Sequence, residues 1–445
     1  MRDGVPARLV RACGSPWAQY ALLAPLLAFA WWGWTRELDL SYAAYGMGPM
    51  SYVYKACDPA SFARDFPGGT EQSGNSAAMY PYVLAYRLAG VTPERLLPVY
   101  VAFELALMAG AMIALTRTLR PNAPPIVSVL VVALVVASGA RDMNLAFFRQ
   151  PLFWGLYYNI ADGLRLLAIV MMLRGRTLTA AVLAAGSVMS HAAMGLAGAV
   201  FLLALAAARP RDALKGRTMA AAALFVALGA GWVFGVLGVQ GVSGGQFPSK
   251  LWFDLTRLTN FHWYPENSGV FTFRHELRFV PFLSFLLLVS FYLTRAAPLR
   301  EADRKVACGM GAMLLLVVMG VAFAGLRVSP TLVKLGLHRA NDLVLTVGLV
   351  YVVAGLWDEV RAGQPVRQVV AAAVLVSPFL GPPGFPLLCS ALLSARAWRS
   401  RRWPRRPVSG CSTPNWKLPK PRGRATTRTS RCGHGKTHRG TLCSW

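Results

Sequence analysis

The stretch Lys55–Tyr80, KACDPASFARDFPGGTEQSGNSAAMY, is a polar segment that lies between strongly apolar runs near 17–35 and 96–116. It holds two aspartates, Asp58 and Asp65, together with proline and glycine residues that prevent one long regular helix. Each flanking run approaches the length of about 20 apolar residues that spans a bilayer core. We therefore expect this stretch to be a polar first loop, held at the surface of a membrane.

The composition of the whole chain also indicates a membrane protein. Of 445 residues, 55% are hydrophobic and 15% are charged, whereas soluble domains carry about 25% charged residues. The apolar runs predict an all-α, polytopic membrane protein of about 10–12 transmembrane helices. They lie near 17–35, 96–116, 124–140, 152–173, 177–190, 193–208, 218–239, 279–294, 306–326, 341–357, 367–380 and 383–395. The short runs 177–190 and 193–208 are expected to form a helical hairpin that does not fully cross.

The net charge of +27 would suit a nucleic-acid-binding protein, but its distribution favours a membrane protein. Segment 396–445 carries 14 Lys and Arg residues and no Asp or Glu, and the remaining cations lie mostly in short loops, as the positive-inside rule produces. A bilayer, and no nucleic acid, is therefore the expected partner. The predicted organisation is a cytoplasmic N-terminus at 1–16, a multi-span domain at 17–395, and a basic, disordered, cytoplasmic tail at 396–445. The outer loops of the multi-span domain are then 36–95, 141–151, 240–278 and 327–340.

His191, between two apolar runs, and Arg165, within another, are ionisable residues that need an explanation in a membrane protein. His191 is costly in a membrane unless it has a partner, so we expect either a functional role or a hydrogen bond to a neighbouring helix. Arg165 lies three residues after Asp162, a spacing typical of a structural ion pair on one helix face. The structural interpretation is favoured for Arg165.

The first loop, which reads Asp58-Pro-Ala-Ser-Phe-Ala-Arg-Asp65, resembles the acidic first outer loop of GT-C-type membrane glycosyltransferases and of related uncharacterised bacterial membrane proteins. Three later motifs are similar in kind and in order: GSVMSHAAMGLAG with His191, RLTNFHWYPE with Arg257 and His262, and HRAND with Arg339. The resemblance implies a GT-C-like bundle with a structured first outer loop. It also implies a polyprenyl-phosphate-linked sugar as donor, and a place in the bacterial inner membrane and cell envelope.

The resemblance, together with the predicted outer position of Arg149, gives roles to seven residues. The catalytic residues would be Asp58 and Asp65, and the substrate-binding residues would be Arg149, His191, Arg257, His262 and Arg339. A carboxylate in a partly dry cleft can deprotonate an acceptor hydroxyl, and arginine can hold the leaving phosphate.

Asp58 and Asp65 are not adjacent, so a single base is favoured over a two-carboxylate metal site. No metal ligands are assigned, and a divalent cation stays open as a cofactor. Two alternatives also stay open: a transporter or flippase of lipid-linked or polar cargo, and a polysaccharide polymerase.

Overall fold

The computed structural model describes residues 15–45, 49–61, 76–136, 144–145, 155–237, 248–259, 263–264, 276–295, 299–361 and 365–376. Every regular element within these ranges is a helix. The chain divides into two units, Met1–Trp398 and Arg399–Trp445, and all the described residues belong to the first. The predicted tail at 396–445 and the predicted last span at 383–395 lie outside the described residues.

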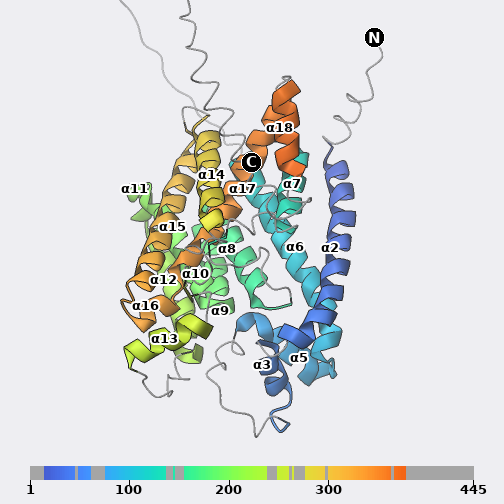
Figure 1. Ribbon diagram of the computed structural model, residues 1–445, viewed down its shortest axis with the longest axis vertical. Coiled ribbons are helices and arrows are strands. Elements are labelled where there is room, and N and C mark those ends of the chain that lie inside the picture. The colour runs from blue at the N-terminus through green and yellow to red at the C-terminus, as the bar shows by residue number, and fades with distance from the viewer. Residues whose placement is uncertain are drawn as a thin grey trace, which may run out of the picture. The chain divides into compact units, whose positions relative to one another are not determined.

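The long helices overlap predicted apolar runs, and shorter helices lie between them (Figure 1). In chain order they are α2 (Pro16–Tyr45), α3 (Pro49–Cys57), η1 (Ala77–Met79), α5 (Tyr80–Ala89), α6 (Pro93–Leu119), α7 (Pro125–Val136), α8 (Tyr157–Leu173), α9 (Thr177–Ser190), α10 (Ala192–Ala207), α11 (Pro210–Ala213), α12 (Gly216–Trp232), η3 (Val233–Leu237), α13 (Ser249–Thr259), α14 (Glu276–Thr294), α15 (Glu301–Gly325), α16 (Pro330–Lys334), η5 (Leu337–Ala340), α17 (Asn341–Arg361) and α18 (Pro365–Val376).

Four of the described helical segments are long and apolar enough to cross a membrane: Pro93–Leu119, Gly216–Val236, Glu301–Gly325 and Pro330–Arg361. Shorter apolar helices accompany them at Ala21–Thr35, Pro125–Val136, Thr177–Ser190, Ala192–Ala207 and Phe282–Thr294. This supports a helical membrane bundle. The count of about 10–12 spans stays a prediction.

Helix α17 lies at the centre of the bundle, packed against α7, α14, α15 and α18. Glycine allows its neighbour α14 to approach closely, because a Cβ at Gly355 would come within 2.1 Å of the Tyr292 ring. Small residues at helix contacts are typical of membrane bundles. Helix α12, by contrast, exposes large apolar side chains such as Met219 and Val226, as expected of a helix that faces lipid.

The described residues of the predicted first outer loop, 36–95, are mostly helical. The loop contains α3, η1 and α5, and α3 packs against α5. Arg87 of α5 donates a hydrogen bond of 3.0 Å to the Ala56 carbonyl at the end of α3. The Tyr54 hydroxyl donates to Glu94 at the start of α6. These bonds fix the helix that precedes Asp58 against the base of the next long helix.

The basic connections that the charge pattern assigns to the cytoplasm gather at one end of the bundle. Arg120 and Arg300 both contact Asp303, at 3.4 and 2.8 Å. Further contacts join the other connections: Arg174 to Thr118, Arg209 to Glu301, and Arg295 to Glu359. Figure 1 shows α11 and α18 toward this basic end, and α3, α5 and α13 toward the opposite end. The side of the membrane that each end faces stays a prediction.

Helices α9 and α10 form the predicted hairpin. His191 alone joins them, and α9 and α10 pack against each other. With 14 and 16 residues, they are about 21 and 24 Å long, shorter than a bilayer core of about 30 Å. Both open ends lie at the basic end of the bundle, so His191 marks the tip.

Candidate functional site

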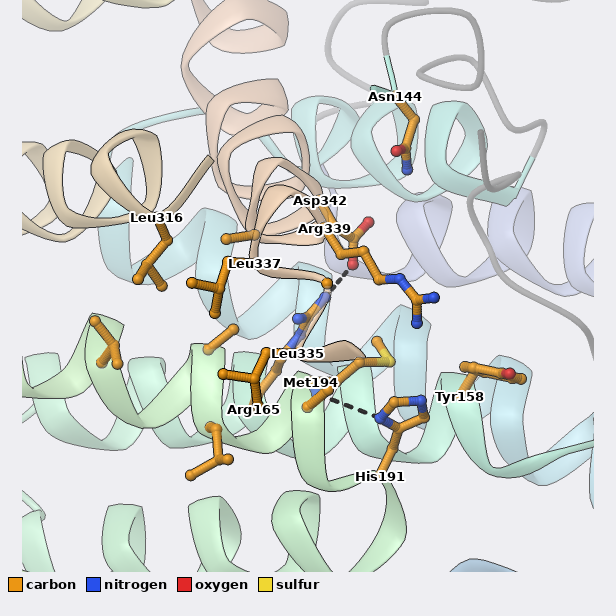
Figure 2. A pocket seen from close by; sticks show the side chains of 16 residues that line it. Asn144, Tyr158, Arg165, His191, Met194, Leu316, Leu335, Leu337, Arg339 and Asp342 are labelled. Carbon is orange, nitrogen blue, oxygen red and sulfur yellow. Dashed lines mark hydrogen bonds and ion pairs between the residues drawn. The ribbon is translucent and has the colours of Figure 1, made fainter. Parts of the chain in front are cut away.

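A cavity of about 100 Å³ brings together two of the predicted binding residues, His191 and Arg339. Arg165, Tyr158 and Asp342 also line it (Figure 2). These side chains come from α8, the α9–α10 tip, η5 and the start of α17, so segments far apart in the sequence build the cavity. Its remaining wall is mostly apolar: Ala193, Met194, Leu196, Ala197, Val200, Leu316, Leu335, Leu337 and Ala340, with Gly336 and Asn144.

His191 reaches the cavity because it ends one helix and begins the next. Its extended backbone breaks α9, and its Nδ1 accepts a hydrogen bond of 3.3 Å from the Met194 amide as the N-cap of α10. Its ring lies 5.1 Å from the Tyr158 ring, centre to centre. The tight turn requires Gly195, where a Cβ would come within 2.3 Å of the Val188 backbone. The first turn of α10 lines the cavity, and its partial positive charge favours an anion there.

Arg339 reaches the cavity from a short turn. Gly336 has φ +57°, a left-handed conformation that glycine adopts readily, and it accepts a 2.9 Å hydrogen bond from the Arg339 amide. Figure 2 shows the Arg339 guanidinium on the same side of the cavity as Asn144, Tyr158 and His191. The turn itself is held by α15, since His338 packs against Gly320, where no side chain would fit.

Arg165 connects the cavity to a buried ion-pair triad. Its Nε donates to Asp162 at 2.6 Å, and its Nη2 donates to Asp342. The predicted pair with Asp162 is therefore confirmed, and the second carboxylate is an addition from α17. Close packing holds the arginine in place, because a Cβ at Gly198 would come within 2.9 Å of Arg165 Cβ. The triad links α17 to α8 beside the cavity.

The other predicted residues lie elsewhere. Asp58 follows α3 in an exposed turn, where it accepts a 2.5 Å hydrogen bond from the Ser61 hydroxyl. That bond lowers the pKa of Asp58 below its usual value, so the carboxylate stays ionised. Arg257 is exposed on α13. Neither Asp58 nor Arg257 lines the cavity, and Asp65, Arg149 and His262 lie outside the described residues.

Ser76, in the first loop, contacts the residue next to His191. The Ser76 hydroxyl donates a buried hydrogen bond of 2.5 Å to the carbonyl of Ser190, the residue before His191. The following turn, η1, packs against α8 and α9. Ser76, the first described residue after Asp65 in the sequence, is therefore bound to the tip of the hairpin.

Sequence reasoning missed Glu104, a fully buried carboxylate on α6. It accepts a 2.6 Å hydrogen bond from the Gly155 amide, and the Tyr82 hydroxyl donates to the Gly155 carbonyl at 2.9 Å. The two side chains clamp Gly155, which lies two residues before α8 and has φ +79°. An acidic residue within an apolar run was the available signal, since intramembrane carboxylates are rarely accidental.

The cavity combines groups that can hold an anion with groups that can orient a ligand. Arg339 and the first turn of α10 suit phosphate oxygens, while Asp342 and the Tyr158 hydroxyl are polar groups that can orient a ligand. Among the described residues, no group of three or more His, Cys, Asp or Glu side chains is placed to hold a metal ion. Comparisons of the chain with protein-family models, with curated proteins and with solved structures found no match.

Proposed function

We propose that this protein is an integral membrane glycosyltransferase that moves a sugar from a polyprenyl-phosphate donor to an acceptor at the end of the bundle opposite the basic connections. The observation that carries the proposal is the meeting of His191 and Arg339 in one cavity beside Arg165. A phosphate at the membrane surface needs a cation, and arginine binds it with two hydrogen bonds.

In this proposal the donor phosphate contacts Arg339 and the first turn of α10. His191 orients that turn through its bond to the Met194 amide. The base is an aspartate of the first loop, whose end is anchored one residue before His191. Asp65 is preferred to Asp58, because Asp58 is already engaged by Ser61 in an exposed turn.

The test is transfer by purified protein in lipid, supplied with a panel of polyprenyl-phosphate sugars. Product should form with one donor class, and Asp65→Asn should abolish it while the protein still inserts and folds. Asp58→Asn is the matched comparison in the same loop, and we expect it to keep most activity. Full activity in both variants contradicts an aspartate base in this loop.

A transporter of polar cargo is the second candidate, and the buried triad favours it. Ionisable residues paired inside membrane helices often mark a transport path, and Arg165 with Asp162 and Asp342 is such a group. Uptake of labelled lipid-linked sugar into sealed vesicles, without covalent transfer, would support this candidate. Covalent product in detergent, where no vesicle exists, would exclude it as the sole activity.

A further inference from the structure

A second cavity, of about 300 Å³, opens at the basic end of the bundle. The ends of α8 and α10, the starts of α9 and α12, and α15 surround it, with Met172, Leu173, Gly175, Thr177, Leu205, Ala206, Arg209, Lys215, Arg217, Thr218 and Lys305 lining it. An ordered water needs about 10–15 Å³. The cavity therefore has space for a headgroup rather than for one or two waters.

Positive charge dominates this basic-end cavity. Four cationic side chains line it: Arg209, Lys215, Arg217 and Lys305. Glu301 contacts two of them, Arg209 at 2.7 Å and Lys305 at 2.8 Å. The residues that line the cavity include these four cations and no Asp or Glu, so the lining itself is positively charged.

Two helix N-termini add to that positive charge. Helices α9 and α12 begin at the cavity, and neither has a side-chain N-cap, which leaves their first amides available to an anion. The Thr177 hydroxyl is buried there and makes no hydrogen bond with any part of the chain that the structure describes. The C-terminal ends of α8 and α10 carry the opposite partial charge, which turn amides offset in part by bonding carbonyls of the last turns.

The ligand that fits is amphiphilic. Met172, Leu173 and Leu205 give the cavity an apolar side, and the nearby Leu214 and Met219 expose most of their surface. A phosphate among the cations could extend its acyl chains along these residues. We propose that the basic-end cavity binds the phosphate group of an acidic phospholipid, as cationic pockets between membrane helices do. This site is separate from the cavity at His191 and does not depend on the transfer reaction.

The test is native mass spectrometry of the purified protein with phosphatidylglycerol or phosphatidylcholine, compared between two variants. Arg217→Gln removes a cation that lines the cavity. Arg211→Gln removes the same charge from an exposed residue of the same connection that does not line it. Both positions are exposed, so both variants should fold.

We expect tight adducts with phosphatidylglycerol and not with phosphatidylcholine. Arg217→Gln should weaken binding of phosphatidylglycerol more than tenfold. Arg211→Gln should weaken it at most about fivefold, which is the effect expected from the general attraction of one cation to an anionic lipid surface. Equal losses in the two variants, or equal binding of both lipids, overturn the proposal. Displacement of the lipid by millimolar inorganic phosphate would also overturn it, since a phosphate ion would then be the ligand.

Discussion

Replacement of Arg165 by methionine should destabilise the protein more than any other single charge removal described here. The arginine side chain is 2% exposed, and its two partners, Asp162 and Asp342, are 8% and 9% exposed. Methionine keeps much of the volume but leaves two buried carboxylates without their shared cation. Breaking a buried ion pair by removing one partner costs about 3–5 kcal/mol, and we expect a loss of that size.

The assay is reversible unfolding in mixed micelles titrated with sodium dodecyl sulfate. Arg174→Gln is the control, because Arg174 is an exposed arginine at the end of the same helix. It should cost about 0–1 kcal/mol, as exposed charges do. Adding Asp342→Asn to Arg165→Met should restore part of the stability by removing one of the two uncompensated charges. A loss below about 1 kcal/mol for Arg165→Met would refute the structural role of the triad.

Three further substitutions test other parts of the account. Gly195→Ala should destabilise the hairpin in the same unfolding assay, since its Cβ would meet the Val188 backbone at 2.3 Å. Gly231→Ala in α12 is the control, because its Cβ would meet nothing within 4 Å, and it should be neutral or stabilising. Equal effects of the two substitutions would contradict the close approach at Gly195. Glu104→Leu should lower the free energy of unfolding by about 1–3 kcal/mol, because it leaves the buried Gly155 amide without an acceptor. Glu104→Gln should lower it less, since the glutamine carbonyl oxygen can still accept that hydrogen bond. A larger loss for Glu104→Gln than for Glu104→Leu would argue against the clamp. Ser61→Ala should raise the pKa of Asp58 toward its usual value by removing the hydrogen bond that lowers it, which carboxyl carbon chemical shifts followed against pH would report. Because that pKa is lowered in the folded state, any stability it contributes is present at neutral pH and is lost as pH falls through the folded pKa, and an unchanged pKa in Ser61→Ala would contradict the assigned cause.

The sequence was sufficient to predict the long apolar helices and the grouping of the basic connections at one end of the bundle. Apolar length located α6, α15 and α17, and the Lys and Arg bias predicted which connections meet at one end, because both signals are local. The hairpin at His191 was also readable, since two short apolar runs next to each other cannot each span a bilayer.

The candidate site was only partly predictable. The spacing of Asp162 and Arg165 predicted their ion pair, but nothing local linked Arg165 to Asp342, which is 177 positions away. The packing of η5 on α10 and α15 likewise brings Arg339 and His191 into one cavity, and neither sequence motif alone predicts that they meet. Glu104 was missed because one acidic residue hardly changes the hydropathy of a long run. Long-range packing decides such contacts, and single-sequence patterns do not report it.

The most direct measurement of the central claim is sugar transfer from the polyprenyl-phosphate donor by Arg339→Gln, compared with Arg327→Gln. Arg327 is an exposed cation that pairs with Asp254 at 3.1 Å and does not line the cavity. We expect at least a hundredfold loss of kcat/KM for Arg339→Gln, on the order of 3 kcal/mol of lost transition-state stabilisation, and less than a twofold loss for Arg327→Gln. Wild-type activity in Arg339→Gln, or equal losses in the two variants, would contradict a phosphate site at this cavity.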